Sequence, residues 1–145
     1  MAFIPYLFFD GNCEAALDFY AEVFGGSVED VSRYAQMPPE AGEVPKGSEA
    51  LVMNATLRVG DDLIMASDSA MAPYERPRGV SIYRGFPDVE RARRVFNRLA
   101  KGGETQMPFE PTFWSPGFGA CRDRFGTEWM IGVDAPPETS QPGAA

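Results

Sequence analysis

Residues 5–26 read PYLFFDGNCEAALDFYAEVFGG, and residues 80–103 read VSIYRGFPDVERARRVFNRLAKGG. Each stretch has a short apolar run, a polar break, an amphipathic segment and a final Gly-Gly pair, and Phe19 and Phe96 occupy equivalent places in the two stretches. The apolar run is typical of a strand, and the apolar spacing that follows predicts a helix. Because one unit occurs twice in a short chain, we expect two paired modules with a ligand site where they meet.

Both stretches extend into a strand–helix–strand–strand–strand unit. The expected strands span residues 3–9, 28–34, 50–59 and 63–67 in the first unit, and 79–86, 105–109, 118–123 and 128–133 in the second. A long loop rich in proline and glycine is expected over residues 36–48. The pattern therefore predicts an α+β fold made of two βαβββ modules.

The two helices carry recognisable start and stop signals. Asn12 and Asp88 are the expected N-caps, because their side chains can accept a hydrogen bond from an early backbone N–H. The Gly-Gly pairs are expected to end the helices, because glycine adopts the left-handed conformation at low cost. The helix boundaries therefore follow from local signals alone.

Composition limits the class of protein. The 145 residues, 44% of them hydrophobic, suit one domain over residues 1–135, with module one at about 3–68 and module two at about 79–134. Residues 136–145, rich in Pro, Ser, Gly and Ala, are expected to form a flexible tail.

Charge and cysteine content bear on partners and location. A net charge of −8 argues against nucleic acid and anionic membrane surfaces. No apolar run approaches the roughly 20 residues of a membrane span, and the first residues lack the basic segment of a signal peptide. Two cysteines fit free thiols in a cytoplasmic protein.

The chain contains no histidine. This absence excludes Ser/His and Cys/His catalytic arrangements, and it excludes every metal site that uses histidine. It also removes the commonest general base.

Strand alternation indicates which side chains avoid the helices. In the third strand, Leu51, Met53, Ala55 and Leu57 are expected to face the helix, and Val52, Asn54, Thr56 and Arg58 the opposite side. In the last strand, Trp129, Ile131 and Val133 are expected to face the helix, and Glu128, Met130 and Gly132 the opposite side. We expect a cleft on that second face.

Residues 5–26, LIMASD at 63–68, TFWSPGFG at 112–119 and DRFGTEWMIGVD at 123–134 together resemble PhnB-like proteins. These belong to the glyoxalase/bleomycin-resistance (vicinal oxygen chelate) superfamily. The resemblance covers residues 4–134 and implies paired βαβββ modules around a U-shaped cleft, commonly in a homodimer. It also implies a divalent metal held by His and Glu side chains from the first and last strands of each module.

The residues at those metal positions do not match. The first-strand His positions fall at Pro5 and Ser81, and the last-strand Glu positions fall near Met65 and at Met130. A third-strand His of PhnB-like proteins corresponds to Asn54. None of these side chains is a normal ligand for a hard metal, so we expect no metal and no cofactor.

PhnB-like chains are also often described as 3-demethylubiquinone methyltransferase domains. The sequence has no glycine-rich turn from strand to helix of the kind that holds a nucleotide cofactor. Both Gly-Gly pairs follow helices instead. The sequence itself therefore does not indicate methyl transfer.

Eight residues are candidates for ligand binding, and each has a structural alternative. Phe113 and Trp114 lie in a loop that would form a mobile aromatic lid, a loop anchor or a dimer contact. Arg122 would bind an acidic ligand or form an ion pair with Asp123 or another carboxylate. The remaining candidates would lie on the cleft face or serve as ordinary strand residues: Asn54, Ser81, Tyr83, Glu128 and Met130.

Four further residues are interpreted mainly as having no role in binding or catalysis. Cys121 is expected to be buried and inert, since no histidine is present to activate its thiol. Asp123 belongs to a turn signal, with a catalytic role as the alternative. Asp10 and Asp68 follow strands and are expected to be solvated charges, with cleft carboxylates as the alternative.

Three functions remain open from the sequence. The first is a metal-independent small-molecule binding protein, for instance one that sequesters its ligand. The second is an enzyme of lyase, isomerase or dioxygenase type with an atypical site, in which Glu128, Asp10, Asp68 or Tyr83 carries acid–base chemistry. The third is an interaction dimer without turnover.

Overall fold

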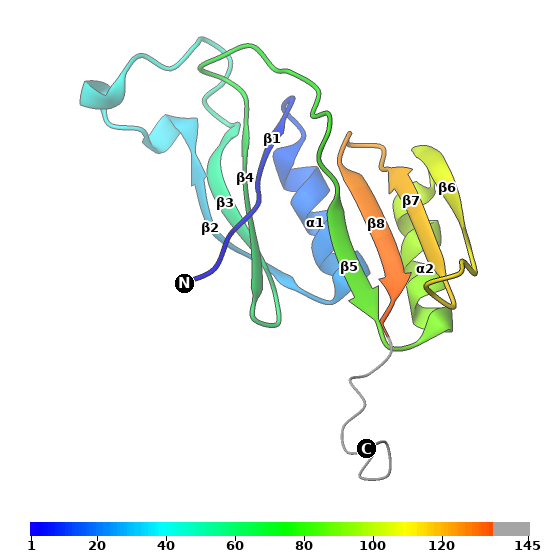
Figure 1. Ribbon diagram of the computed structural model, residues 1–145. Coiled ribbons are helices and arrows are strands. Elements are labelled where there is room, and N and C mark those ends of the chain that lie inside the picture. Colours follow the sequence, from blue (N-terminus) through cyan, green and yellow to red (C-terminus); the bar gives the residue numbers. More distant parts are fainter. Residues whose placement is uncertain (135–145) are drawn as a thin grey trace. The chain divides into compact units, whose positions relative to one another are not determined.

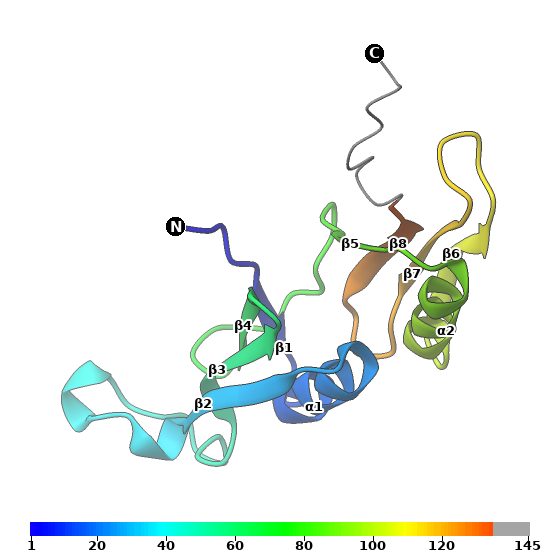
Figure 2. The same cartoon turned by 90° about the horizontal axis from the view of Figure 1, so that it is seen from below.

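The computed structural model describes residues 1–134, which form two compact units over 1–77 and 78–134. The predicted tail at 136–145 lies outside the described residues. Each predicted module falls within one unit, and each unit has one helix on one face of a four-stranded sheet (Figure 1). Figure 2 shows the same pairing of helix and sheet from below. The prediction of an α+β fold with two βαβββ modules is confirmed.

The first unit contains β1 (Tyr6–Phe9), α1 (Cys13–Phe24), β2 (Ser27–Arg33), two 3-10 turns (Tyr34–Gln36 and Pro39–Ala41), β3 (Val52–Val59) and β4 (Asp62–Asp68). Its sheet has the order β1-β4-β3-β2, in which β1 is parallel to β4 and the other pairs are antiparallel. The apolar stripe of α1 packs on this sheet, with Leu17 and Tyr20 fully buried.

The second unit contains β5 (Ile82–Phe86), α2 (Val89–Ala100), β6 (Glu104–Glu110), β7 (Phe118–Arg122) and β8 (Glu128–Val133). Its order, β5-β8-β7-β6, repeats the topology of the first sheet, with β5 parallel to β8. Neither helix of residues 1–134 is long and apolar enough to cross a membrane.

The Gly-Gly pairs are Gly25-Gly26 and Gly102-Gly103. In both pairs the first glycine ends the helix and the second allows close packing against a strand. The first glycine of each has a positive φ, 74° and 77°, which favours glycine. The second glycine lies against a strand: a Cβ on Gly26 would be 2.3 Å from the Arg58 carbonyl oxygen, and one on Gly103 would be 2.2 Å from that of Arg122. No side chain fits at either second position.

The two helix starts differ. Asp88 caps α2 as predicted, because its side chain accepts from the Glu90 N–H at 2.9 Å. The expected cap by Asn12 is wrong: its side chain makes no capping bond, and its Oδ1 is buried without a partner. Instead, Asp68 Oδ1 accepts from the Cys13 N–H at 2.9 Å.

Asp68 was expected to be a solvated charge, and this expectation is wrong. Its side chain is 2% exposed. Its second oxygen accepts from the Val52 N–H at 2.9 Å, and its backbone carbonyl accepts from the Tyr34 hydroxyl at 2.7 Å. The carboxylate is therefore a structural centre of the first unit, joining α1, β3 and β4. Asp10 is exposed, as expected.

The long segment between β2 and β3 closes at its base. The Tyr34 N–H donates to the Leu51 carbonyl at 3.0 Å, and the Ala35 N–H donates to the Glu49 carbonyl at 2.9 Å. The two ends of the segment therefore lie side by side, while the residues between them are mostly exposed.

Candidate functional site

The face of the second sheet opposite α2 gathers most of the candidate residues. In β8, Trp129 and Ile131 are at most 1% exposed, as expected for residues under α2. Gly119, paired with Ile131, marks the same side, because a Cβ there would lie 2.8 Å from the ring of Phe96 in α2. The alternate residues of β8, Glu128, Met130 and Gly132, therefore point the other way, as predicted.

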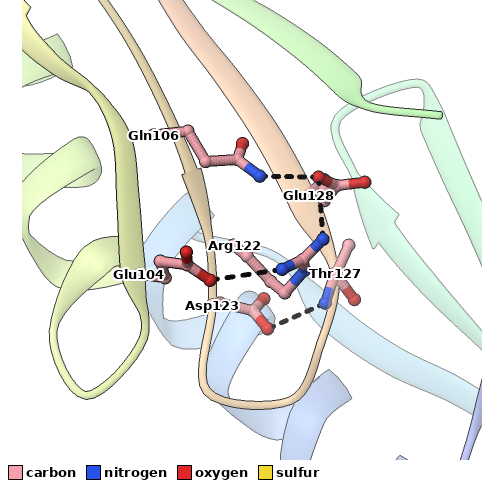
Figure 3. Close-up of polar contacts among 6 residues, drawn as sticks. All are labelled: Glu104, Gln106, Arg122, Asp123, Thr127 and Glu128. Carbon is pink, nitrogen blue, oxygen red and sulfur yellow. Dashed lines mark hydrogen bonds and ion pairs between the residues drawn. The ribbon is translucent and has the colours of Figure 1, made fainter. Parts of the chain in front are cut away.

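One end of this face carries a group of four polar side chains, the Arg122 cluster, which Figure 3 shows. Arg122 contacts Glu104 through one terminal nitrogen and Glu128 through the other, each at 3.2 Å. Gln106 donates to the same Glu128 oxygen at 2.7 Å. The predicted ion pair of Arg122 with a carboxylate is confirmed, and the partners are Glu104 and Glu128.

The Arg122 cluster is only partly exposed and retains unused hydrogen-bonding capacity. The side chains of Arg122 and Glu128 are 18% and 12% exposed. The Arg122 Nε is buried and has no hydrogen-bond partner within residues 1–134. Both hydrogen bonds to Glu128 end on Oε1, which leaves Oε2 for another donor. With two carboxylates and one guanidinium, the cluster has a formal charge of −1 at neutral pH.

Asp123 lies beside this cluster but has a structural role. It is 3% exposed, and its Oδ1 accepts from the Phe125 N–H at 2.8 Å. The same oxygen accepts from the Thr127 N–H at 3.1 Å (Figure 3). Its Oδ2 accepts from the Trp129 indole N–H at 2.8 Å. The predicted turn is confirmed, and these three hydrogen bonds lie within the hairpin.

The middle of the face is less polar. Met130 is half-buried and lies between Ala120 of β7 and Tyr83 of β5, its register partners. The Tyr83 hydroxyl donates to Asp134 Oδ1 at 2.5 Å. Partial burial, followed by this hydrogen bond and the nearby negative charge, raises the pKa of Tyr83 to about 12. Tyr83 is therefore a protonated hydrogen-bond donor at neutral pH.

The other end of the face is aromatic. Phe113 and Trp114 form an edge-to-face pair with centroids 4.7 Å apart, and Trp114 also contacts Phe118 of β7 at 5.4 Å. Ser115 secures the loop, since its hydroxyl donates to the carbonyl of Gly117 at 2.7 Å. Phe113 remains fully exposed.

The remaining two candidates are Ser81 and Asn54. Ser81 precedes β5 and is exposed. Asn54 belongs to the first unit, where its amide donates to the Tyr6 hydroxyl at 3.1 Å. A hydrogen bond to a side chain of another strand is a structural role for Asn54. Sequence reasoning missed Tyr6, because pairing of β1 with β4 brings it near β3 and no local pattern signals that contact.

The arrangement of the possible ligand side chains and the state of the two thiols bear on metal binding. Within residues 1–134, no group of three or more His, Cys, Asp or Glu side chains is arranged to hold a metal ion. Both cysteines are fully buried, and burial raises the pKa of each thiol to about 12. The expected burial of Cys121 is confirmed, and the raised pKa agrees with an unreactive thiol.

Comparisons with known proteins place the chain in a family. The family model for 3-demethylubiquinone-9 3-methyltransferase matches residues 1–132. Protein YjdN of Escherichia coli is 33% identical, covering 92% of this chain and 95% of its own. Protein PA1353 from Pseudomonas aeruginosa has a similar structure, with 39% identity, a TM-score of 0.84, and 94% and 99% of the two chains covered.

Two further structures connect this family to a wider fold. The PhnB protein from Bacillus cereus is 26% identical, with a TM-score of 0.78 and 92% and 100% coverage. A glyoxylase/bleomycin resistance protein/dioxygenase domain from Frankia is 13% identical with a TM-score of 0.63 and 92% and 96% coverage, which shows the fold alone. The chain therefore belongs to the PhnB-like 3-demethylubiquinone-9 3-methyltransferase family and has the fold of glyoxalase/bleomycin-resistance domains.

Proposed function

We propose that this protein binds a small organic molecule, without a metal, on the face of the second sheet opposite α2. The observation that carries the proposal is the composition of that face. A half-buried ionic cluster lies at one end, Met130 and Tyr83 lie in the middle, and Trp114 with Phe118 lies at the other end. Apolar and aromatic surface with a few placed polar groups is typical of small-molecule sites.

The Arg122 cluster would orient a ligand bound at such a site. The Arg122 Nε is a buried donor without a partner, and an unmade hydrogen bond in such a place costs about 1–3 kcal/mol. Glu128 Oε2 is an unused acceptor on a side chain that is 12% exposed. A ligand that presents a donor to Glu128 Oε2 would use this acceptor, next to the Arg122 guanidinium.

The family description names a methyltransferase, yet the helix starts favour binding over methyl transfer. A nucleotide-type cofactor commonly uses the free N–H groups at a helix start. Here the start of α1 donates to Asp68 and the start of α2 donates to Asp88. One N–H at each helix start is therefore already bonded to a carboxylate of the chain.

A ligand screen followed by matched variants tests the proposed function. We expect at least one compound from a broad small-molecule library to raise Tm saturably, because a ligand that binds only the folded chain stabilises it. Glu128→Gln and Arg122→Gln should weaken that ligand about tenfold, which corresponds to the loss of one charged hydrogen bond. The control, Glu75→Gln, changes an exposed loop carboxylate outside the site and should leave Kd unchanged. Failure of every compound, or equal binding by all four proteins, would exclude the proposal.

Two further proposals concern assembly and location. We propose a homodimer, supported by the exposed apolar side chains near the edge strand β1, namely Phe3, Ile4, Tyr6 and Phe8. Light scattering on the purified protein tests this, and a monomer at micromolar concentration would refute it.

We also propose a cytoplasmic location, supported by the two free thiols. Fractionation of cells that produce the protein tests this second point.

A further inference from the structure

Two glycines face each other on neighbouring strands of the proposed binding face. Gly85 of β5 and Gly132 of β8 are register partners, and Gly132 alternates onto the same side as Met130. Neither has a positive φ, so the backbone conformation does not require glycine at these positions. Glycine within a strand is unfavourable, and it often marks a place where another group approaches the backbone closely.

The approaching groups are Tyr83 and Asp134. A Cβ on Gly132 would lie 2.7 Å from the Tyr83 hydroxyl oxygen, and one on Gly85 would lie 1.7 Å from Asp134 Oδ2. The two glycines therefore form a floor without side chains, and the phenol ring and the carboxylate lie over it. We call this arrangement the glycine floor.

The groups over the glycine floor are lightly held. Tyr83 is 50% exposed, and Asp134 is exposed as well. The hydrogen bond between the hydroxyl and Asp134 Oδ1, 2.5 Å long, is the polar contact that keeps the ring in place. Rotation of the Tyr83 side chain would open a flat surface of backbone beside Met130, with a carboxylate acceptor at its edge.

We propose that the glycine floor is a subsite for a planar aromatic ring that carries a hydroxyl or N–H donor, and that Tyr83 occupies this subsite when the ligand is absent. The phenol of Tyr83 has the geometry of the expected ligand group: a flat ring over Gly132 and a donor directed at Asp134, whose carboxylate lies over Gly85. A ligand of this class displaces the Tyr83 ring and takes over the hydrogen bond. This inference rests on the proposed function and names the ligand class.

The first test removes the internal occupant and supplies a substitute. In Tyr83→Ala, we expect p-cresol, which reproduces the tyrosine side chain, to bind saturably in titrations followed by NMR. Toluene, which lacks the donor, should bind about tenfold more weakly, because it loses a hydrogen bond to a charged acceptor. The wild-type protein should also bind p-cresol about tenfold more weakly than Tyr83→Ala, because the ligand must first displace Tyr83.

Three further variants locate the binding. Tyr83→Ala combined with Gly132→Val should lose p-cresol, because a side chain then stands on the floor. Tyr83→Ala combined with Asp134→Ala should bind p-cresol and toluene equally. Tyr83→Phe keeps the ring and loses its hydrogen bond, so its affinity for p-cresol should fall between those of the wild type and Tyr83→Ala. If Tyr83→Ala does not fold, Tyr83→Phe replaces it in the p-cresol titration.

Several results would overturn the inference. These are no saturable binding of p-cresol to a folded Tyr83→Ala or Tyr83→Phe, equal binding of toluene, or unchanged binding when Gly132→Val is added. The proposed function is judged separately, because its variants lie at Glu128 and Arg122 and its screen uses the wild-type chain. A library ligand that depends on Glu128, found together with a failure of p-cresol, would reject the glycine floor alone.

Discussion

The Asp68 carboxylate joins segments that are distant in the sequence. Its two oxygens accept from the N–H groups of Cys13, at the start of α1, and Val52, at the start of β3. Because Asp68 is only 2% exposed, these hydrogen bonds are protected from competition with water. No local pattern signals this role, because the two donors are contributed by different parts of the unit. This explains why the sequence favoured Asn12 as the cap.

Replacement of Asp68 should therefore be costly. Asp68→Asn places an amide NH2 group against one of the two N–H donors, and we expect the free energy of unfolding to fall by about 2–4 kcal/mol. Asp10→Asn, at an exposed position, is the matched control and should change it by less than about 0.5 kcal/mol. Urea unfolding of both variants measures the effect. Equal stability of the two variants would mean that Asp68 is not a structural centre.

The buried thiols predict a dependence of stability on alkaline pH. Burial raises the pKa of Cys13 and Cys121 from 9.0 to about 12. The unfolded chain releases these protons above about pH 9 and the folded chain keeps them, so stability is full below pH 9 and falls as pH rises towards 12. Between pH 8 and pH 10, the loss should be about 1–2 kcal/mol for each thiol.

Comparison with a variant isolates the contribution of the thiols, because other groups also titrate in alkali. The variant Cys13→Ala/Cys121→Ala should lose about 3 kcal/mol less than the wild type between pH 8 and pH 10. Urea unfolding at the two pH values measures both losses. Identical losses in the two proteins would contradict thiol ionisation as the cause.

At the scale of elements, the second glycine of each Gly-Gly pair is more constrained than the first. Gly25 has open space around a hypothetical Cβ, so Gly25→Ala should cost only the strain of positive φ, about 1 kcal/mol. Gly26→Ala and Gly103→Ala push a methyl group into a strand carbonyl, and we expect about 2–3 kcal/mol for each. Chemical denaturation gives the ranking. A larger cost at Gly25 would contradict the close-approach argument.

Most elements could be predicted because their signals are local. Apolar periodicity and the Gly-Gly pairs give helices within one or two residues of α1 and α2, and the hairpin around residues 124–127 gives β8 as predicted. The predicted bounds, a strand at 118–123 and a turn at 124–127, would place Asp123 opposite Glu128. The observed strand ends at Arg122, which is the register partner of Glu128, so this pairing was not predicted. The contact between Tyr6 and Asn54 was not predicted either, because it depends on the order of strands in the sheet.

At the scale of the whole molecule, the chain should behave as a protein without a structural or catalytic metal. The chain has no histidine, and residues 1–134 hold no group of three suitable ligand side chains. We expect less than about 0.1 equivalents of transition metal by elemental analysis, and a Tm that dialysis against a chelator leaves unchanged. Stoichiometric metal, or a Tm lowered by the chelator, would contradict this prediction.

The closed base of the segment between β2 and β3 has a practical consequence. Because hydrogen bonds from Tyr34 and Ala35 hold its two ends together, the sheet is largely indifferent to the length of chain between them. Doubling such a loop costs only about 0.6 kcal/mol. A reporter peptide spliced after Gly42 would therefore leave the fold intact, which makes this segment a permissive attachment point for labels in binding studies.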